Sequence, residues 1–360
     1  MYKDVVILIP AYNPNIDIMK EFICTLNNTF PNIVIVNDGS LPQYTSFFNQ
    51  LSTEHIVITH YINLGKGRAL KTGMNYILNN YPNIKAIITA DSDGQHVVKD
   101  IKKCYHKWQK SPDSLVLGCR DFKSKEVPFK SRYGNKITKD IFMLFTGLKI
   151  SDTQTGLRVM SKEVATYLLN VKGERYEYET NVLLATKRLD ISITEEKIGT
   201  IYLNNNKESH FNPIKDSIEI YKLFMKYIIS SLSSFILDIF LFTIFIKLTN
   251  EVITSSVISR IISSIYNFLI NKNLIFNNSD NKSIIKYYLL VIIQLAISTT
   301  ITQVLNNCIK LNIVIIKILV DTFIFIINFV IQREIVFKKK INNADKLSDF
   351  NYINEVRYEE

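Results

Sequence analysis

The sequence predicts an α/β domain with a mostly parallel sheet, followed by an all-α domain of four transmembrane helices. Over residues 1–226, short apolar segments rich in β-branched residues alternate with helix-like segments, which is the order of a βαβ fold. Over residues 227–337, four long segments contain few charges. Core helices of soluble proteins are usually shorter than these segments, so four in a row favour a membrane domain.

Five apolar segments are predicted to be strands: VVILIP, NIVIVND, HIVITH, KAIITA and LVLGC. Helix-like stretches such as NIDIMKEFICTLNN and GRALKTGMNYILNN separate them. In sheets of this kind, ligands bind at the carboxyl ends of the strands. The motifs PAYN, NDGS, NLGKG and DSDGQ each follow a predicted strand, so we expect them to meet at one edge of the sheet.

A helix of about 20 apolar residues crosses a hydrocarbon core of about 30 Å. On this basis the transmembrane helices are predicted over about 227–246, 252–271, 287–309 and 311–332. Ionisable residues inside such spans are costly unless they are paired or face water, and this chain places four there: Asp238, Arg260, Lys317 and Asp321. Lys317 and Asp321 stand one helical turn apart, which suits an ion pair, a role in transport or binding of a lipid headgroup. Lys317 could also extend toward the outer membrane surface.

Basic residues are distributed unequally between the two sides of the predicted membrane domain. One side has Lys222, Lys226, Lys272, Lys282, Lys286, Arg333, Lys338, Lys339 and Lys340, and the other has Lys247 and Lys310. By the positive-inside rule, both termini are expected in the cytosol, and the protein is expected to be a multi-pass protein of the cell membrane. No signal peptide precedes the first strand, so we expect the N-terminal domain to stay in the cytosol.

The predicted domains are residues 1–212, an amphipathic linker helix over 213–226, the membrane domain over 227–337 and a polar cytosolic tail over 338–360. A weak internal repeat relates NFLINKNLIF at 267–276 to NFVIQREIVF at 328–337, as expected of duplicated helix pairs. The formal charge of +10, from 43 Lys and Arg against 33 Asp and Glu, suits phosphates or a lipid surface. The sequence contains no nucleic-acid-binding motif, so we expect no nucleic acid as a partner.

Two aspartates stand one residue apart in DSDGQ, directly after the apolar segment IKAIITA. Carboxylates at a strand end can hold a hard divalent cation through oxygen, and Gln95 can add a carbonyl oxygen or order a bound water. The sequence therefore predicts a site for Mg²⁺ or Mn²⁺ formed by Asp91, Asp93 and Gln95. Such an ion neutralises the charge that develops on a leaving diphosphate. The alternative is a pair of solvated surface acids.

The ordered motifs VVILIPAYNP, IVNDGS, NLGKGRALKTGMN, TADSDGQH, LGCRD and DTQTGLRVMS resemble the family 2 glycosyltransferases of the GT-A fold. They resemble most closely the polyprenyl-phosphate sugar transferases, the group that contains dolichol-phosphate mannose synthase. Residues 227–337 resemble the GtrA-like four-helix membrane domain. The two resemblances cover almost the whole chain and imply a GT-A (Rossmann-like) first domain.

The resemblance also implies roles for individual residues. The nucleotide-sugar-binding set would be Pro10, Ala11, Tyr12, Asn13, Asp38, Lys66, Asp91, Ser92, Asp93, Arg120 and Lys207. The acceptor-phosphate set would be Arg132, Arg158 and His210, and the catalytic set would be Asp93, Arg120, Arg132 and Asp152. Asp38 would reach the base or the ribose. The D-x-x-x-G-x-R turn, residues 152–158, would position the sugar or serve folding.

The chemistry of a lipid phosphate acceptor agrees with these residue types. A phosphate monoester is already ionised near pH 7, so it can attack the anomeric carbon without a general base, and arginines suit its oxygens. Asp152 is needed as a base only if the acceptor is a hydroxyl. Basic and apolar residues interleave over 128–145, which predicts a helix lying in the headgroup plane or, alternatively, a helix packed on the domain core.

Together these features predict an inverting, metal-assisted transfer of one sugar from a nucleotide diphosphate to polyprenyl phosphate on the cytosolic leaflet. One alternative is a membrane carrier, flippase or scaffold for lipid-linked sugars with a secondary transferase domain. Another is a transferase acting on a different polysaccharide or lipid acceptor. The sequence leaves open the choice between donors such as UDP-glucose and GDP-mannose, the polyprenol length and the oligomeric state, including a homo-oligomer.

Overall fold

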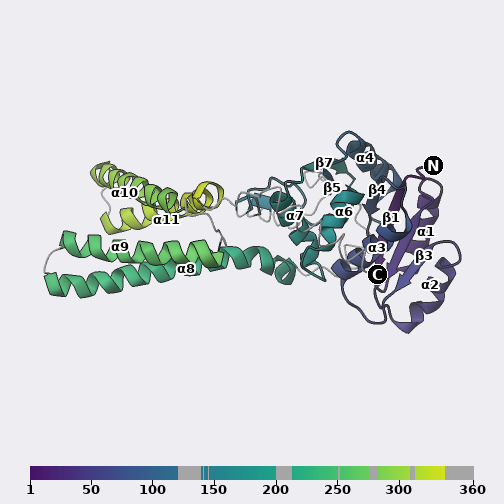
Figure 1. The fold of residues 1–360 in the computed structure, drawn as a ribbon, viewed down its shortest axis with the longest axis horizontal. Coiled ribbons are helices and arrows are strands. Elements are labelled where there is room, and N and C mark those ends of the chain that lie inside the picture. The colour runs from purple at the N-terminus through teal and green to yellow at the C-terminus, as the bar shows by residue number, and fades with distance from the viewer. Residues whose placement is uncertain are drawn as a thin grey trace, which may run out of the picture. The chain divides into compact units, whose positions relative to one another are not determined.

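The computed structural model describes residues 1–120, 139–140, 142–144, 146–199, 213–249, 252–275, 283–308 and 313–336. The chain divides into two compact units, one made mainly by residues 1–217 and the other by residues 218–340. The first unit combines a sheet with helices on both faces, and the second consists of helices (Figure 1). The predicted α/β class of the first unit is therefore confirmed.

A seven-stranded sheet forms the centre of the first unit, in the order β3-β2-β1-β4-β6-β5-β7. Its strands are β1 (Val5–Ala11), β2 (Ile33–Asn37), β3 (Ile56–Thr59), β4 (Ala86–Thr89), β5 (Leu115–Arg120), β6 (Arg158–Ser161) and β7 (Ile193–Ile198). The five predicted strands are present, and every pairing is parallel except those of β6 with β4 and β5. Strands β6 and β7 were not among the predicted five. Arg158, predicted to lie in a turn, instead opens β6.

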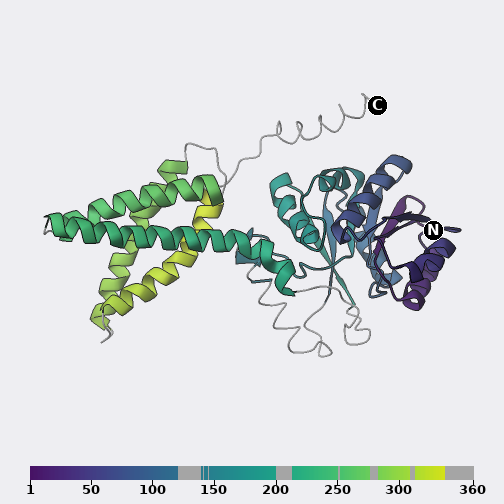
Figure 2. The same cartoon turned by 90° about the horizontal axis from the view of Figure 1, so that it is seen from below.

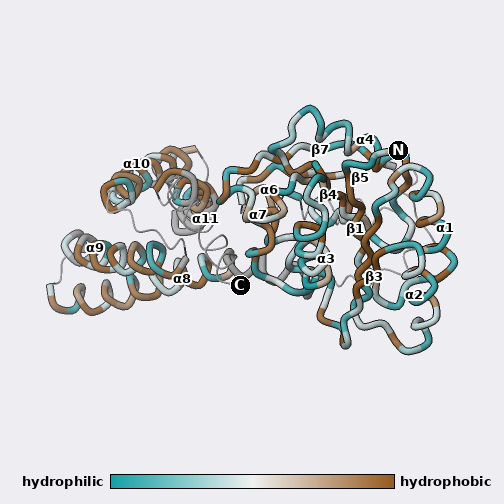
Figure 3. Tube along the Cα trace, turned by 45° about the vertical axis from the view of Figure 1, so that its right-hand side comes forward, coloured by the Kyte–Doolittle hydropathy of each residue, from teal (hydrophilic) through white to brown (hydrophobic). Residues whose placement is uncertain are grey.

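Two layers of helices cover the sheet. Helices α1 (Ile16–Asn27), α2 (Thr45–Leu51) and α4 (Val98–Gln109) bury their apolar residues in one cluster with the strands. Helices α3 (Lys66–Asn80) and α6 (Lys162–Leu169) pack on the other face, and α7 (Glu177–Leu189) packs against α3. Figure 3 shows the strands as a hydrophobic centre between more polar helices.

Strand β1 shows why these segments form a buried sheet. Successive side chains point to opposite faces of a strand, so a strand covered on both sides is apolar throughout. Val5, Ile7 and Ile9 belong to the cluster with α1 and α4. Leu8 points to α3, where the absence of a side chain at Gly73 leaves room for it. The two helical layers hold β1 in place and thereby fix the edge where its carboxyl end lies.

The second unit contains the helices α8 (Pro213–Thr249), α9 (Val252–Ile270), α10 (Ser283–Cys308) and α11 (Ile313–Ile331), shown in green to yellow in Figure 2. The predicted linker helix and first span are one continuous helix, α8. Among the described residues, one helix, Met225–Thr249, is long and apolar enough to cross a membrane, and Ser283–Gln294 and Thr322–Ile331 are shorter apolar stretches. Four membrane spans therefore remain a prediction.

The internal repeat has a structural counterpart. Helices α9 and α11 both end in a π-helical turn, Asn271–Ile275 and Gln332–Val336, at the same position of the repeat. Asn271 and Gln332 occupy equivalent places, and the Asn271 amide nitrogen donates to Gln332 Oε1 at 2.9 Å. Asn271 also accepts from the Ser230 hydroxyl at 3.0 Å and donates to Asn267 Oδ1 at 2.8 Å. These buried hydrogen bonds join α8, α9 and the turn after α11.

Two of the four ionisable residues predicted inside the spans pair with each other. Arg260 Nη2 of α9 lies 3.4 Å from Asp238 Oδ2 of α8, and the Ser263 hydroxyl donates to Asp238 Oδ1 at 2.9 Å. This agrees with the high cost of an unpaired charge in a hydrocarbon environment. Lys317 and Asp321 both lie in α11, but their side chains lie outside the described ones, so their pairing remains a prediction.

We predict that Asn271→Leu destabilises the second unit by about 1 kcal/mol, because it leaves polar partners of the side chain unpaired between helices. Gln332→Leu should cost a similar amount, and the double variant should cost less than the sum. The measurement is unfolding of the detergent-solubilised protein by SDS titration. Thr249→Val, at an exposed position at the end of α8, is the control. Full additivity of the two substitutions would contradict a shared hydrogen bond.

Candidate active site

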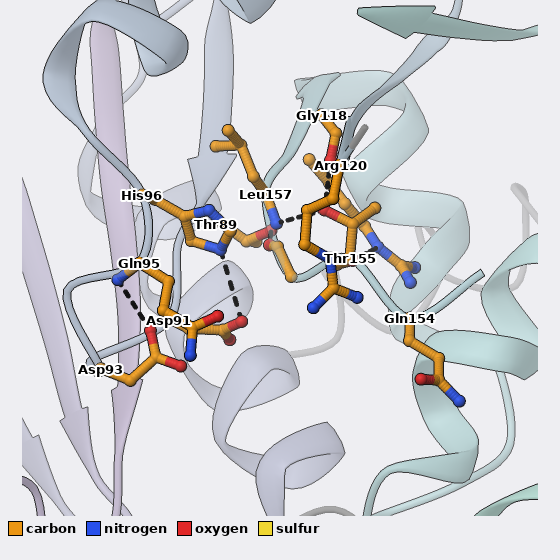
Figure 4. Close-up of polar contacts among 12 residues, drawn as sticks. Thr89, Asp91, Asp93, Gln95, His96, Gly118, Arg120, Gln154, Thr155 and Leu157 are labelled. Carbon is orange, nitrogen blue, oxygen red and sulfur yellow. Dashed lines mark hydrogen bonds and ion pairs between the residues drawn. The ribbon is translucent and has the colours of Figure 1, made fainter. Parts of the chain in front are cut away.

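The loop after β4 gathers three oxygen-bearing side chains at the carboxyl end of the sheet. Asp91, Asp93 and Gln95 all lie between β4 and α4 and are partly buried. The Gln95 backbone N–H donates to Asp93 Oδ1 at 3.1 Å, which folds the loop back on itself. Figure 4 shows these side chains close to one another, with His96 directed at Asp91. The loop thus brings together the donors that were predicted to hold a cation.

Lys66, the first residue of α3, connects this loop to α7. Its Nζ lies 2.7 Å from Asp91 Oδ1 and 3.0 Å from Glu179 Oε1. Burial works against the charged form of the lysine, but the two carboxylates outweigh it and raise the pKa of Lys66. Burial likewise opposes ionisation of Asp91, yet Lys66 and then His96 hold the pKa of Asp91 well below its usual range. The ion pair is therefore fully charged at neutral pH.

Asp93 has the opposite electrostatic environment. Burial, and after it the negative charge of Asp91, raise the pKa of Asp93 above its ordinary value. Any positive charge that binds in the loop therefore stabilises the ionised form of Asp93. Neighbouring carboxylates whose pKa values are pushed apart are typical of functional sites.

His96 and Glu179 are two site residues to which the sequence analysis assigned no role. His96 Nε2 lies 3.4 Å from Asp91 Oδ2, and its buried Nδ1 has no hydrogen-bond partner among the described residues. Its position directly after DSDGQ was a usable signal. Glu179 lies in the first turn of α7, and nothing in the local sequence marks it as a neighbour of Asp91. Only the packing of α7 against α3 brings it there.

The D-x-x-x-G-x-R turn is locked to the aspartate loop. A Cβ at Gly156 would overlap the carboxylate of Asp91, so only glycine leaves room for that side chain. The Thr89 hydroxyl donates to the Gly156 carbonyl at 2.7 Å. The turn therefore shapes the place where Asp91 lies.

Arg120 and Asp152 form a bidentate ion pair. Arg120 Nε and Nη2 lie 2.7 Å and 3.0 Å from the two carboxylate oxygens of Asp152. Asp152 is 1% exposed and also accepts from the Gln154 backbone N–H at 3.2 Å. Both oxygens of Asp152 are engaged in this structure, so a role as a general base would require Arg120 to move. The pair orients the Arg120 guanidinium beside the end of β5.

Arg158 is directed into the protein. It is 4% exposed, its Nε donates to the Thr155 carbonyl at 3.1 Å, and its Nη1 donates to the Glu179 carbonyl at 3.0 Å. These bonds tie the start of β6 to α7. A direct contact with an acceptor phosphate would need this packing to open.

Asp38 shapes the loop that leads into Lys66. Its carboxylate accepts from His60 Nδ1 at 2.7 Å, from the Asn63 side chain at 3.0 Å and from the backbone N–H groups of Leu64 and Gly65 at 3.0 Å and 2.8 Å. Gly65 has φ +106°, a conformation that glycine adopts at little cost. The predicted contact of Asp38 with a base or ribose stays a prediction.

The first motif, PAYN, lies where β1 ends. Pro10 and Ala11 are buried in the strand, whereas Tyr12 is 37% exposed beyond it. Asn13 Oδ1 accepts from the Leu41 backbone N–H at 2.9 Å, which joins PAYN to the residues after NDGS. Ser92 is partly buried in the aspartate loop.

Several predicted site residues lie outside the described part of the chain. These are Arg132, Lys207 and His210, together with most of the segment 128–145. Their roles stay predictions.

The donor set suits a hard cation that arrives with its substrate. Asp91 and Asp93 offer carboxylate oxygens, and Gln95 offers an amide oxygen. No group of three or more His, Cys, Asp or Glu side chains is arranged to hold a metal within the described residues. Mg²⁺ is commonly held by one or two carboxylates together with substrate phosphates, so two aspartates are enough.

Comparison with known proteins identifies two segments. Residues 6–168 match the sequence model for glycosyl transferase family 2, and residues 226–337 match that for the GtrA/DPMS transmembrane domain. An uncharacterized protein of Methanocaldococcus jannaschii is 30% identical over 227 residues, which are 62% of this chain and 92% of that protein.

A second relative is the UDP-N-acetylglucosamine--dolichyl-phosphate N-acetylglucosaminyltransferase of Methanococcus voltae. It is 30% identical over 220 residues, which are 56% of this chain and 86% of the relative. Among solved structures, a glucosyl-3-phosphoglycerate synthase from Mycobacterium tuberculosis, in complex with Mn²⁺, UDP and phosphoglyceric acid, aligns with a TM-score of 0.47. That alignment has 14% identity and covers 61% of this chain and 78% of the synthase.

We predict that Gly156→Ala lowers the affinity for Mn²⁺ about tenfold or more, because the added methyl group forces the Asp91 carboxylate out of place. Mn²⁺ titration followed by electron paramagnetic resonance measures the change, and thermal unfolding checks that the variant folds. Gly199→Ala is a matched control, since its Cβ would meet the Asp100 carboxylate at an ordinary 3.4 Å. Equal Mn²⁺ affinity in both variants would contradict the proposed fit between Gly156 and Asp91.

The family match spans the part of the first unit that contains the site. Residues 6–168 include the aspartate loop, the Arg120–Asp152 pair and the D-x-x-x-G-x-R turn. A relative with 30% identity is matched over 92% of its own length. The chain therefore belongs to glycosyl transferase family 2, as its motifs predicted, and carries a GtrA/DPMS transmembrane domain after the glycosyltransferase domain.

Proposed function

We propose that this glycosyltransferase moves one sugar from a nucleotide diphosphate to a polyprenyl phosphate on the cytosolic leaflet. The observation that carries the proposal is the charged group at the end of the sheet, in which Asp91, Asp93 and Gln95 lie beside the Lys66 ammonium. A departing diphosphate needs positive charge beside it. The aspartates can bind a cation that supplies this charge, and the Lys66 ammonium can contact the phosphate oxygens.

The Methanococcus voltae relative supports the substrate classes of the proposal. Its name specifies a UDP-sugar as donor and dolichyl phosphate as acceptor. The matched transmembrane domain would hold such a lipid acceptor and the enzyme in the same bilayer. Positive residues on the predicted cytosolic side would place the first unit in the cytosol.

The residues can perform the transfer in one displacement. An oxygen of the acceptor phosphate forms a bond to the anomeric carbon while the bond to the diphosphate oxygen breaks, so the nucleoside diphosphate leaves and the configuration inverts. The acceptor is already an anion, so no side chain has to remove a proton. This agrees with the engagement of both Asp152 oxygens by Arg120.

The site's own charges serve the leaving group. Asp91, Asp93 and Gln95 would hold Mg²⁺ or Mn²⁺, which supplies positive charge to the departing diphosphate when bound. Lys66 adds an ammonium next to Asp91. Arg120, whose Nε and Nη2 are held by Asp152, would contribute a fixed positive charge to the diphosphate.

The experiment incubates the purified full-length protein, reconstituted in liposomes, with polyprenyl phosphate and each of UDP-N-acetylglucosamine, UDP-glucose and GDP-mannose. We expect glycolipid from at least one donor, and loss of product on treatment with EDTA. Asp93→Asn should lower the rate about a hundredfold or more, because it removes a carboxylate that would hold the cation, and the cation stabilises the charge on the departing diphosphate. Asp113→Asn, at an exposed turn residue, is the control and should keep the wild-type rate.

Two outcomes would contradict the proposal. Product formation at full rate with Asp93→Asn would contradict the proposal that the reaction needs a cation held by Asp93. If lipid-linked sugar moved across the vesicle membrane without any turnover of nucleotide sugar, a membrane carrier would be favoured over a transferase.

A further inference from the structure

Glu179 is a buried acid that the transfer reaction itself does not use. Its side chain is 9% exposed and lies 3.0 Å from the Lys66 ammonium. Its backbone carbonyl accepts from Arg158 Nη1 at 3.0 Å. Glu179 therefore offers Lys66 a second anion from a backbone position that α7 and the start of β6 hold in place.

Lys66 competes with a divalent cation for Asp91. Its ammonium lies 2.7 Å from Asp91 Oδ1, and the side chains of Lys66 and Asp91 are 17% and 26% exposed, so water screens the pair only in part. A cation bound to Asp91 would therefore be repelled by the ammonium. Without another anion nearby, Lys66 would stay on Asp91 and weaken the site.

Glu179 changes this balance. It gives the ammonium a partner that is not a predicted metal ligand, so Asp91 can turn to a cation while Lys66 keeps an ion pair. An ammonium has three N–H donors, and the two carboxylates use two of them. The remaining donor suits an oxygen of the diphosphate.

We propose that Glu179 is a positioning residue. It keeps the Lys66 ammonium in the site, so that Asp91 can bind a divalent cation and Lys66 can contact the diphosphate. The inference rests on the proposed function, because it requires a cation at Asp91 and Asp93. Glu179 acts through Lys66 and does not contact the substrate or the cation.

The test measures binding of Mn²⁺ alone to the purified full-length protein by electron paramagnetic resonance. We expect Glu179→Gln to weaken Mn²⁺ binding about tenfold, because Lys66 then keeps its ion pair with Asp91 and competes with Mn²⁺ for that carboxylate. Lys66→Met should strengthen binding, since the competing charge is gone. In the Lys66→Met background, Glu179→Gln should weaken binding less than threefold.

The matched control is Glu174→Gln, which removes the carboxylate that pairs with Arg68 and, at 3.2 Å, with Lys71 on the same helix α3. It should leave Mn²⁺ binding unchanged. Thermal unfolding establishes that each variant folds, and Glu179→Asp, which keeps the charge, should recover part of the binding lost in Glu179→Gln.

The outcomes separate this inference from the proposed function. Unchanged Mn²⁺ binding in Glu179→Gln, or the same loss with and without Lys66, would overturn the positioning role alone. Absence of Mn²⁺ binding to the wild-type protein, with or without UDP, would overturn both. Normal Mn²⁺ binding without any glycolipid would contradict the proposed function, and the Glu179 comparison would still decide the inference.

Discussion

The ion pair between Lys66 and Asp91 is the interaction on which the site depends. It joins the loop after β4 to the start of α3, the helix that follows β3. A partly buried carboxylate remains ionised when a positive partner offsets the cost of burial; in this structure Lys66 is the main partner of Asp91, and a bound cation would take over that role. The same pair leaves Asp93 as the acid whose negative charge is least compensated, so positive charge entering the loop is stabilised there.

The neighbouring motifs hold the two partners of this pair in place. Asp38 closes the loop before Lys66 by accepting hydrogen bonds from Leu64 and Gly65. Gly156 gives the Asp91 carboxylate the space it occupies. Much of what the family motifs do in this structure is therefore to build the frame of the site, and fewer residues are left to face a substrate. A rigid frame favours transfer because a preorganised site needs little rearrangement as charge develops.

Polar and charged groups in the second unit are likewise paired with one another. Asn271 and Gln332 end equivalent helices of a repeated pair and hydrogen-bond to each other in its interior. Asp238 is met by both Arg260 and Ser263. Buried polar groups between apolar helices bond to one another because lipid offers them no partner. These hydrogen bonds lie inside a domain that exposes many large apolar side chains, and much of its trace is brown in Figure 3.

The sequence by itself determined the local features of this protein. The alternation of apolar segments located five strands, the strand-end motifs placed the site at one edge of the sheet, and the repeat predicted that residues 267–276 and 328–337 are equivalent. These features depend on neighbours along the chain, which periodicity and turn chemistry report directly. Tertiary structure alone decided that Glu179 faces Lys66, that Asp152 is engaged by Arg120, that Arg158 turns inward and that Gly156 makes room for Asp91. Each of these is a contact between residues far apart in the chain, and it depends on how strands and helices pack in three dimensions, which no local pattern specifies.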